Sequence, residues 1–344
     1  MLVRYGFSAW ILGGIAMAFS VSAENHVLVS NQNDYYKDHV VSDTAQKILE
    51  GAWDLHVHCS PAPNPADVNG GLDGFVVNDF ELVTEAREAG MRGLCIKNHE
   101  FGTFYRAWLA TKACGEGKTT AYGSLTLGYN VGGINPYAVQ AAAQCGAKLV
   151  WFPTTSARNQ HTIWGGFAPY PHSGDAGVDG DSNAEITKPI GIFLLDEEGE
   201  LIPGVREVIE IARDANIALA TGHMSWLESI ALIKAANKMG FKKMIYTHVD
   251  WRNCQLTIAQ QKMLAELGVY MEKSFYEFDK ERALSSFNEI DAKHYILSSD
   301  MGMFPDLRHI KGFGCEIDEY LDGGISVEDL MVMTHDNPGF LMEG

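Results

Sequence analysis

Short runs of apolar residues recur along the chain from residue 52 onward, and longer stretches with helical spacing lie between them. Runs of about four to eight residues bounded by turn-forming residues are typical of buried strands. The pattern predicts eight strands, expected at Ala52–His58, Met91–Lys97, Thr120–Leu127, Ala147–Pro153, Ile217–His223, Met244–His248, Val269–Lys273 and Tyr295–Asp300.

The stretches between the strands carry residues that begin and end helices. Asn135-Pro136 places a capping side chain before a proline at the first helical position, and Ser225-x-x-Glu228 has the spacing of a capping box. Glycine follows several of the expected last turns. Helices are expected over Ser42–Leu49, Asp79–Ala89, Thr103–Cys114, Asn135–Gly146, Val205–Asp214, Ser225–Gly240 and Val327–Thr334, the last ending near Asn337-Pro338.

Strict alternation of strand and helix favours a parallel sheet, and eight such units across residues 51–344 predict one α/β domain, a (β/α)8 TIM barrel. A doubly wound open sheet is the alternative. No Gly-x-Gly-x-x-Gly follows any expected strand, so its dinucleotide-binding version has no support.

Residues 155–202 interrupt this rhythm after the fourth strand. Residues 155–190 are rich in Gly, Asn, Asp and Ser, and irregular loops of this length are usually functional lids or disordered segments. Residues 192–202 are expected to form a small hairpin turning at Glu198-Gly199. The spacing of the aspartates does not fit an EF-hand, so calcium is not indicated.

The first 23 residues have the pattern of a secretory signal peptide. Arg4 precedes an apolar run from Phe7 to Phe19, and Val21-Ser22-Ala23 is a small-x-small cleavage site. An uncleaved anchor is the alternative, but the run is shorter than the ~20 residues of a spanning helix. We expect export to the periplasm or secretion, an N-terminal extension at 24–50, and no membrane span after the signal is removed.

Composition narrows the class of partner. The 344-residue chain has a formal charge of −18, and loss of Arg4 leaves 25 basic against 44 acidic residues, or −19. Such a surface repels nucleic acid, so a small-molecule substrate is expected instead. Six cysteines lie far apart without a Cys-x-x-Cys pair, which favours neither a zinc ribbon nor a disulfide scaffold. Whether copies associate into a homo-oligomer is left open.

Histidines gather where the expected strands end. His56 and His58 share one face of the first strand, with Asp54 one step deeper, and adjacent imidazoles are ready ligands for Zn²⁺. In a parallel barrel, catalytic groups occupy the carboxyl ends of the strands. The other strand ends carry Lys97 and His99, His223, His248, and Ser299-Asp300.

Strand alternation predicts which side chains point inward. If Leu55, Val57, Leu94, Ile96, Ile245 and Leu297 pack outward, the inward set is His56, His58, Cys95, Lys97, His99, His248 and Asp300. A lone buried lysine is costly, so it should be paired, held at depressed pKa, or converted to a metal-binding carbamate. Together these residues predict a metal centre.

The pattern resembles the amidohydrolase superfamily of metal-dependent hydrolases over residues 52–340. The resemblance consists of Asp54-x-His56-x-His58, single histidines ending strands five and six, Ser299-Asp300, and an Asn337-Pro338 turn after the last helix. It is closest to an uncharacterised branch, marked by Ile96-Lys97-Asn98-His99, Gly132-Gly133-Ile134-Asn135-Pro136, Trp151-Phe152-Pro153-Thr154 and Thr221-Gly222-His223.

The resemblance implies a set of ligands. His56 and His58 would bind a first metal with Asp300, which would also take a proton from the attacking water. His223 and His248 would bind a second metal; in single-metal members, His223 would be a ligand and His248 would stabilise the oxyanion. Zn²⁺ is favoured, with Mn²⁺, Fe²⁺ and Co²⁺ also suited to these donors.

One departure concerns strand four. Two-metal members usually carry a carboxylated lysine there, whereas this strand ends Trp151-Phe152-Pro153-Thr154. Lys97 could supply the bridging carbamate instead, or the site could hold one metal only.

Substrate contacts are expected on loops at the mouth of the barrel. His99, Asn130, Arg158 and Arg252 are the selected candidates, and either arginine could orient a substrate carboxylate. Glu272 either faces the mouth or forms a structural ion pair.

The predicted function is hydrolysis of an amide, lactone, ester or related bond, with Asp300 as general base and acid. The alternatives are a metal-dependent lyase, acting as decarboxylase or hydratase on the same barrel, and an exported binding protein for a metal or small ligand. Asp300 discriminates against the last, because a binder needs no proton-shuttling carboxylate beside the histidines.

Overall fold

The eight strands form one sheet in sequential order, β1 to β8, with every neighbouring pair parallel. The computed structural model describes residues 36–63, 71–163, 191–275, 280–302 and 307–344. The predicted signal peptide lies outside these residues. The strands are β1 (Trp53–His58), β2 (Gly93–Lys97), β3 (Thr120–Thr126), β4 (Leu149–Trp151), β5 (Ala218–Ala220), β6 (Met244–Tyr246), β7 (Tyr270–Ser274) and β8 (Tyr295–Ser298).

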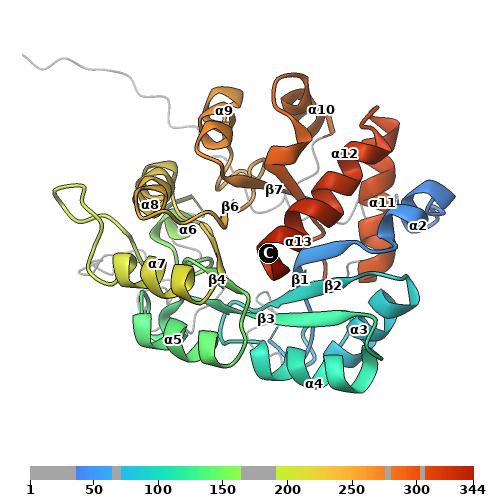
Figure 1. Ribbon diagram of the computed structural model, residues 1–344, viewed down its shortest axis with the longest axis horizontal. Coiled ribbons are helices and arrows are strands. Elements are labelled where there is room, and N and C mark those ends of the chain that lie inside the picture. The colour runs from blue at the N-terminus through green and yellow to red at the C-terminus, as the bar shows by residue number, and fades with distance from the viewer. Residues whose placement is uncertain (1–35, 64–70, 164–190, 276–279, 303–306) are drawn as a thin grey trace, which may run out of the picture.

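Contacts between the first and last strands close the barrel. Val57 forms a parallel bridge with Met301 just beyond β8. The Asp300 amide donates to the His56 carbonyl at 2.8 Å, and the His58 amide donates to the Met301 carbonyl at 2.8 Å. The predicted (β/α)8 barrel is therefore confirmed, and the helices surround the sheet in Figure 1.

The outer helices begin with the expected caps. Ser42, Asn135 and Ser225 each accept a hydrogen bond from the first turn of their helix, and Ser225 forms the predicted capping box with Glu228. The helices are α2 (Asp43–Leu49), α3 (Asp79–Glu88), α4 (Phe104–Cys114), α5 (Pro136–Gln144), α6 (Arg158–Ile163), α7 (Val205–Asp214), α8 (Trp226–Lys238), α9 (Ile258–Glu266), α10 (Lys280–Ser285), α11 (His309–Asp322), α12 (Val327–Met331) and α13 (Asn337–Glu343). The sequence pattern did not assign α6, α9, α10, α11 and α13.

The C-terminal end differs from the prediction. Asn337-Pro338 does not end the last helix, because a π-helical turn over Val332–Asp336 joins α12 to α13. Asn337 donates from Nδ2 to the carbonyls of Lys293 and Tyr295, which ties α13 to the start of β8. Leu341 and Met342 of α13 pack into the cluster inside the barrel. The C-terminus lies over the barrel end in Figure 1.

Two hydrophobic layers separate the barrel interior from the helices. Val57, Leu94, Ile96 and Leu297 pack outward as predicted. Leu55 and Ile245 were expected there too, but both lie in the interior cluster, which consists of Trp53, Leu55, Cys95, Leu149, Trp151, Ala218, Ala220, Ile245, Ile296, Leu341 and Met342. A register shift between Asp54 and Val57 breaks the alternation in β1.

The predicted direction of Asp54 is also wrong, for the same reason. Its carboxylate is directed at β8 and α11, where it accepts hydrogen bonds from Ser299 Oγ at 2.5 Å and His309 Nε2 at 2.8 Å. It also accepts from the amides of His56 and Ser299. Asp54, near the start of β1, therefore ties this strand to the end of β8 and to α11.

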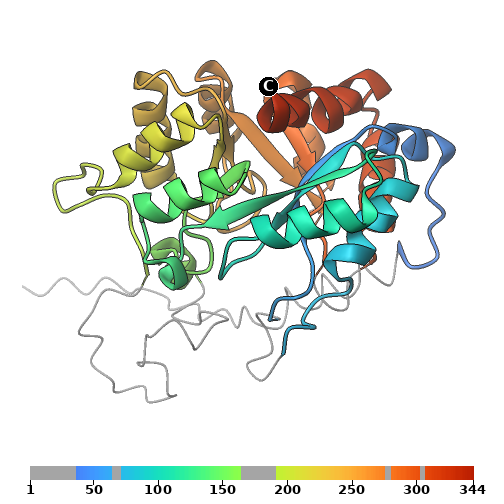
Figure 2. The same ribbon diagram turned by 60° about the horizontal axis from the view of Figure 1, so that its bottom comes forward.

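The interruption after β4 is only partly described. Residues 164–190 lie outside the described chain, so the predicted lid stays a prediction. The expected hairpin is reduced to one antiparallel bridge between Leu195 and Leu201, and Gly199 at its turn has a φ of +81°. Figure 2 shows the described parts of this region, α6 and residues 191–202, beside the barrel.

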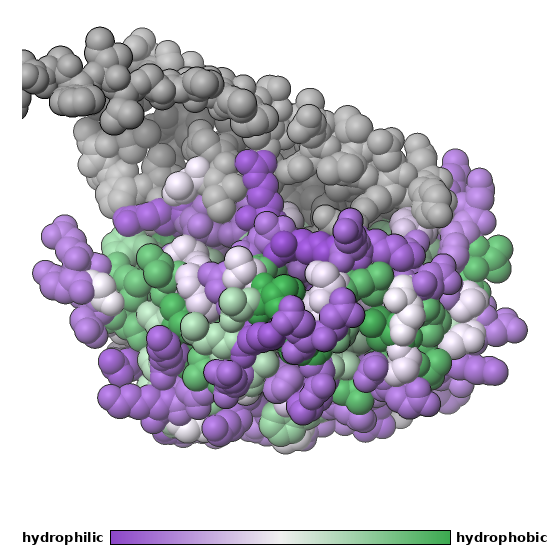
Figure 3. Space-filling view, turned by 90° about the horizontal axis from the view of Figure 1, so that it is seen from above, coloured by the Kyte–Doolittle hydropathy of each residue, from purple (hydrophilic) through white to green (hydrophobic). Residues whose placement is uncertain are grey.

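The outer surface has the mixed character of a helical layer. Figure 3 shows hydrophilic residues over much of one face, with hydrophobic groups between them. Among the described residues, no helix combines the length and apolar character that a membrane crossing requires. All six cysteines are free thiols.

We predict that Glu316→Gln stabilises the protein increasingly as pH rises. Glu316 lies fully buried on α11, and burial, reinforced by the nearby Asp54 charge, raises the pKa of its carboxyl well above 4.5. Above about pH 4.5, Glu316 ionises in the unfolded chain but keeps its proton in the folded chain. The free energy of unfolding therefore falls as pH increases. The variant should gain about 1 kcal/mol or more at pH 8 and little at pH 4.

Urea unfolding at both pH values measures this difference. Glu328→Gln is the control, because Glu328 is exposed. A Glu316→Gln gain that is the same at pH 4 and pH 8 would contradict the explanation.

Candidate metal centre

Five imidazoles form a closed ring at the carboxyl ends of the strands. His56 and His58 end β1, while His99, His223 and His248 lie just beyond β2, β5 and β6. Going round the ring, the centroids of neighbouring imidazoles are 5.4 Å apart for His56 and His58, 5.0 Å for His58 and His99, and 6.3 Å for His99 and His223. The ring closes with 5.3 Å between His223 and His248 and 5.0 Å between His248 and His56.

The carboxylate of Asp300 joins three of these rings. Its Oδ1 lies 2.8 Å from His56 Nε2 and 3.2 Å from His58 Nε2, and its Oδ2 lies 3.7 Å from His248 Nε2. Donor atoms of His56, His248 and Asp300 all lie within 4.8 Å of one another. Backbone geometry contributes to this convergence, because His248 and Asp300 have φ values of +59° and +49°, in the sparsely populated left-handed region.

Lys97 reaches the same centre from β2. Its Nζ lies 2.7 Å from His56 Nε2 and 4.5 Å from the centroid of the Trp151 ring, and the residue is only 2% exposed. The inward direction predicted for this lysine is therefore correct. Its charge contributes to lowering the pKa of each of the five imidazoles.

Residues behind the ring set the orientation of the imidazoles. Glu272 Oε1 lies 3.0 Å from His56 Nδ1, so this carboxylate accepts the Nδ1 proton and leaves Nε2 facing the centre. Glu272 is thus a partner of His56 beneath the site, and its Oε2 also accepts from the His248 amide.

A similar arrangement fixes His223. Gln160 Oε1 lies 3.1 Å from His223 Nδ1 and accepts a hydrogen bond from Asn253 Nδ2. An oxygen acceptor at that position places the His223 proton on Nδ1 and the lone pair on Nε2. Within the described residues, Nε2 is buried and has no hydrogen-bond partner. Asn159 donates to the His223 carbonyl and steadies the same loop.

Burial keeps most of the ring neutral. It lowers the pKa of His58 to about 4 and that of His248 to about 3. Burial also holds the pKa of His99 and His223 well below 6.5. Four imidazoles therefore carry an available lone pair at neutral pH, as a metal ligand must.

His56 and Asp300 form the charged part of the centre. Burial lowers the pKa of His56, but the carboxylates of Asp300 and Glu272 outweigh it and raise that pKa above 6.5. Burial raises the pKa of Asp300, but the charge and hydrogen bonds of His56 and His58 hold it well below 3.8. Asp300 is therefore a carboxylate across the physiological pH range.

These donors fit a divalent ion. Imidazoles and one carboxylate converge, the outer nitrogens of His56 and His223 are hydrogen-bonded, and the inner Nε2 of His223 is buried without a hydrogen-bond partner in the described part of the chain. This is the donor chemistry of zinc and related ions. The structure brings together all six predicted metal ligands: His56, His58, Lys97, His223, His248 and Asp300.

The four predicted substrate-binding residues lie in different surroundings. His99 stands in the imidazole ring. Arg158 instead stacks on Phe193, with its guanidinium carbon 4.1 Å from the ring centroid. Asn130 and Arg252 are exposed. Their roles in binding a substrate stay predictions.

Two aromatic residues that the site prediction did not select border the histidines. Phe75 stacks on His58 with centroids 5.6 Å apart, and Trp251 meets His223 and His248 edge-on at 4.9 and 5.2 Å. Gln160, which orients His223, was also missed. Trp251 was recognisable as a residue on a mouth-side loop. Nothing local in the sequence distinguishes Phe75 or Gln160, because their loops meet the ring only in the folded chain.

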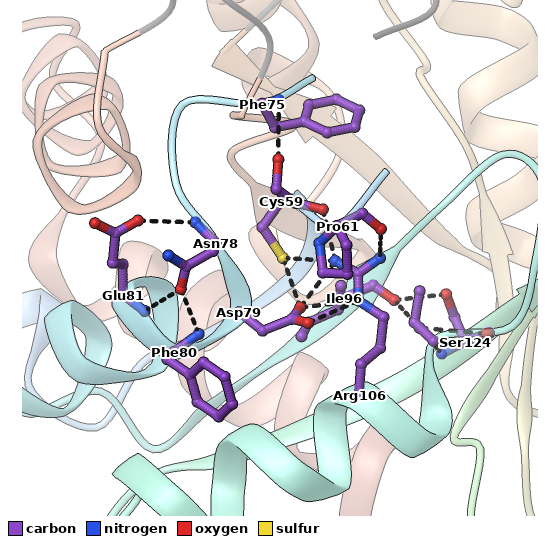
Figure 4. A network of polar contacts seen from close by, with 12 residues as sticks. Cys59, Pro61, Phe75, Asn78, Asp79, Phe80, Glu81, Ile96, Arg106 and Ser124 are labelled. Carbon is purple, nitrogen blue, oxygen red and sulfur yellow. Dashed lines mark hydrogen bonds and ion pairs between the residues drawn. The ribbon is translucent and has the colours of Figure 1, made fainter. Parts of the chain in front are cut away.

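An ion pair between a buried aspartate and a partly buried arginine holds the segment that follows His58. Arg106 of α4 contacts Asp79 of α3 through Nε and Nη2, at 2.9 and 2.8 Å (Figure 4). The same guanidinium donates to the carbonyls of Cys59 and Pro61 at 2.6 and 2.8 Å. The Cys59 thiol donates to Asp79 Oδ1 at 3.1 Å. Two helices are therefore fastened to the backbone directly after the metal-ligand strand.

Comparisons with known proteins identify the family of the chain, which has no assigned activity, and solved structures that share its fold. A sequence model described as "Family of unknown function (DUF6282)" matches residues 51–272. No match was found among curated proteins.

Solved structures support the barrel assignment. An amidohydrolase from Pseudomonas aeruginosa aligns with a TM-score of 0.54 at 10% identity, covering 87% of this chain and 98% of its own. The probable dipeptidase PvdM from the same organism gives 0.53 at 10% identity, covering 87% and 97%. A mutant organophosphorus hydrolase from Deinococcus radiodurans gives 0.50 at 14% identity, covering 88% and 95%. At these identities the likeness establishes the fold.

We predict that Glu272→Gln weakens metal binding. The substitution keeps an acceptor for His56 Nδ1 but removes the negative charge that makes this imidazole a stronger ligand. The affinity for Zn²⁺ should fall about 10-fold to 100-fold. Competition with a chelating dye measures it, and Glu289→Gln, at an exposed surface pair with Lys262, is the control. Unchanged affinity would exclude this role for Glu272.

We predict that Arg106→Ala destabilises the protein strongly. It leaves the Asp79 carboxylate buried without its partner, a loss of about 3–5 kcal/mol in the free energy of unfolding. Arg106→Lys should recover part of this, because lysine keeps the charge but not the fork. Urea unfolding of both variants checks the expectation.

The control for Arg106 is Arg92→Ala, which removes an exposed pair with Glu343 and should cost about 1 kcal/mol or less. Equal losses for the Arg106 and Arg92 variants would show that the buried network does not stabilise the fold.

Proposed function

Because the chain belongs to the DUF6282 family, which has no assigned function, its activity must be argued from its site, and we propose that it is a metal-dependent hydrolase of the amidohydrolase type. The proposed substrate is a small molecule with an amide, lactone or ester bond. One observation carries the proposal: Nε2 atoms of His56, His58 and His248 converge on the carboxylate of Asp300.

The fold supports this reading. The same barrel occurs in the amidohydrolase and the probable dipeptidase described above. In parallel barrels, active sites occupy the carboxyl ends of the strands, which is where the imidazole ring lies.

The proposed ligands are His56, His58, His223, His248 and Asp300, with the Lys97 amine beside His56. When bound, a divalent ion supplies a water of pKa ~7 and polarises the carbonyl oxygen of the substrate. Zn²⁺ suits the donors best, and Mn²⁺ or Fe²⁺ are alternatives. Reaction of the Lys97 amine with CO2 would give a carbamate and release one proton, adding a second carboxylate to the set.

Asp300 handles the proton in the proposed reaction. Asp300 is ionised at neutral pH, because its pKa is held below 3.8, so its carboxylate can serve as the acceptor of the proton from the attacking water. The water oxygen bonds to the substrate carbonyl carbon, the C–N or C–O bond breaks, and the proton passes from Asp300 to the departing nitrogen or oxygen.

The residues around Asp300 keep its carboxylate in place. The Asp300 amide donates to the His56 carbonyl, and the adjacent Ser299 donates to Asp54. His248 Nε2, 3.7 Å from Asp300 Oδ2, stands where it can orient the same carboxylate or, with one ion only, hydrogen-bond to the developing oxyanion. Export of the enzyme, inferred from residues 1–23, is part of the proposal.

We predict that Asp300→Asn removes turnover and leaves metal in the protein. Zinc-loaded protein would be assayed with p-nitrophenyl acetate, a γ-lactone series and N-acyl amino acids. The best substrate of the wild type should be hydrolysed at least ~100-fold more slowly by the variant, because asparagine cannot accept the water proton.

Elemental analysis of the same samples separates loss of chemistry from loss of metal. Asp291→Asn, which alters an exposed surface pair with Lys293, is the control and should keep full activity. Wild-type turnover in the Asp300 variant would overturn the mechanism, and metal-free wild-type protein after loading with Zn²⁺ would overturn the metal centre.

A further inference from the structure

Two neighbouring helices on the outside of the barrel present an apolar face to solvent. On α4, Tyr105, Trp108 and Leu109 are 68%, 59% and 54% exposed. Residues three and four positions apart lie on one face of a helix, so these side chains form a single outward surface. On α5, Tyr137 is 87% exposed, and Ala141, four residues later, is exposed on the same face. A surface helix normally places polar side chains there.

The two apolar surfaces join where the helices meet. Cys145, the residue that caps the end of α5, donates from Sγ to Tyr105 Oη at 3.2 Å, near the start of α4, and both residues are exposed. Figure 1 shows α5 and α4 following one another along the same side of the barrel. The combined surface, called here the α4–α5 stripe, consists of Tyr137, Ala141, Cys145, Tyr105, Trp108 and Leu109.

The same part of the chain lacks negative charge. Residues 101–163 contain five basic residues and one acidic residue, Glu116, a net charge of +4 that leaves −22 for the rest of the chain. Neither α4 nor α5 contains an aspartate or a glutamate. The helix beside α5, α7, differs because Glu207, Glu210 and Asp214 are exposed on it. The α4–α5 stripe is therefore an acid-free apolar surface on a strongly acidic molecule.

We propose that the α4–α5 stripe is the interface through which two copies of this chain form a homodimer. Two molecules that each carry a charge of −18 repel one another, and the repulsion is weakest where neither presents a carboxylate. The stripe is such a place. Removing its aromatic and aliphatic side chains from water supplies the favourable free energy of association.

Charge favours a second copy over a lipid surface. A helix that binds in a membrane interface combines apolar side chains with several lysines or arginines. Lys112, whose Nζ lies 5.9 Å from the centre of the Trp108 ring, is the only exposed basic residue of α4 and α5, because Arg106 is turned to Asp79. Anionic headgroups would also repel the acidic remainder of the molecule.

The size of the stripe fits a dimer interface. An aromatic side chain carries about 150–250 Å² of surface, so the four large side chains expose roughly 400–600 Å² on each copy. The alanine, the thiol and the glutamines of α5 beside them bring this close to the ~800 Å² that each partner buries in a specific complex.

The contact between Cys145 and Tyr105 marks the middle of the stripe. At ~1.5 Å per residue, Tyr137 lies about 12 Å from Cys145 along α5, and Lys112 about 10 Å from Tyr105 along α4. A two-fold axis at this midpoint packs α5 of one copy on α4 of the other, as an isologous interface requires. The aromatic ring of Tyr137 then meets the Trp108 and Leu109 side chains of the second copy.

Sedimentation velocity and light scattering of the purified protein test the proposal. Wild type should be a dimer at micromolar concentration. Trp108→Glu and Tyr137→Glu should each raise the dissociation constant ~30-fold or more, because they bury a carboxylate in the apolar interface. Leu227→Glu is the matched control, since Leu227 is as exposed as Tyr105 but lies on α8, and this variant should stay dimeric.

Two further measurements report on the driving force and the symmetry. Raising NaCl from ~0.1 to ~1 M should strengthen the dimer, because screening weakens the repulsion between the acidic remainders. A short bis-maleimide should link two wild-type chains through Cys145, near the two-fold axis, and should not link Cys145→Ser.

Three results would overturn the proposal. The first is wild-type protein that stays monomeric at roughly 100 μM, well above the dissociation constant of a micromolar interface. The second is a dimer that persists in both Trp108→Glu and Tyr137→Glu, with circular dichroism showing that the variants are folded. The third is monomeric protein that binds phosphatidylglycerol vesicles and loses this binding in Trp108→Glu, which would assign the stripe to a lipid surface. A covalent dimer of Cys145→Ser would contradict the two-fold axis at Cys145.

Discussion

The structure depends on compensating charge in a buried space. Lys97 and His56 carry or attract positive charge inside the barrel, where an unpaired ion would be costly. The carboxylates of Asp300, just after β8, and Glu272, on β7, compensate this positive charge. The same contacts turn His56 Nε2 toward the centre. Each of these charges is compensated by the opposite charges beside it. The contacts that stabilise the core therefore also determine the geometry of the site.

The supporting residues show how a barrel holds such a centre in place. The Asp54 carboxylate accepts hydrogen bonds from β1, from the residue after β8 and from α11. These bonds fix the backbone beside His56 and Asp300. Arg106 and Asp79 fasten the segment after His58 from the helix layer. On the other side, Lys273 and Asp250 form a buried pair at 2.7 Å beside the loop of His248. Rigid outer contacts of this kind are what precise ligand geometry requires.

At two positions, the backbone conformation that the site requires is unfavourable for folding. His248 and Asp300 both adopt left-handed backbone conformations, which cost energy for residues with a Cβ atom. In each case the conformation aims the side chain at the centre. Glu316 also costs folding free energy, because its carboxyl is buried. Burial and the charges of three acidic residues raise its pKa, so the Glu316 carboxyl keeps its proton and stays neutral. These costs are borne by a large apolar core, most of which lies between the barrel and its helices.

The sequence by itself determined the eight strands, most helix starts and the set of histidines, because period, caps and strand-end position are local properties. It placed Lys97 inward and brought His56, His58, His223, His248 and Asp300 together correctly. It failed at Leu55 and Asp54, because strict alternation does not anticipate the register shift in β1. It also failed at Ile245 of β6, which lies in the interior cluster. The inward direction of His99 was also predicted. Only the tertiary structure decided that Thr154, Gln160 and Glu272 contact and orient the imidazoles of His99, His223 and His56, and that Arg158 stacks elsewhere. Those partners come from distant segments, and their distances are set by packing that no local pattern contains.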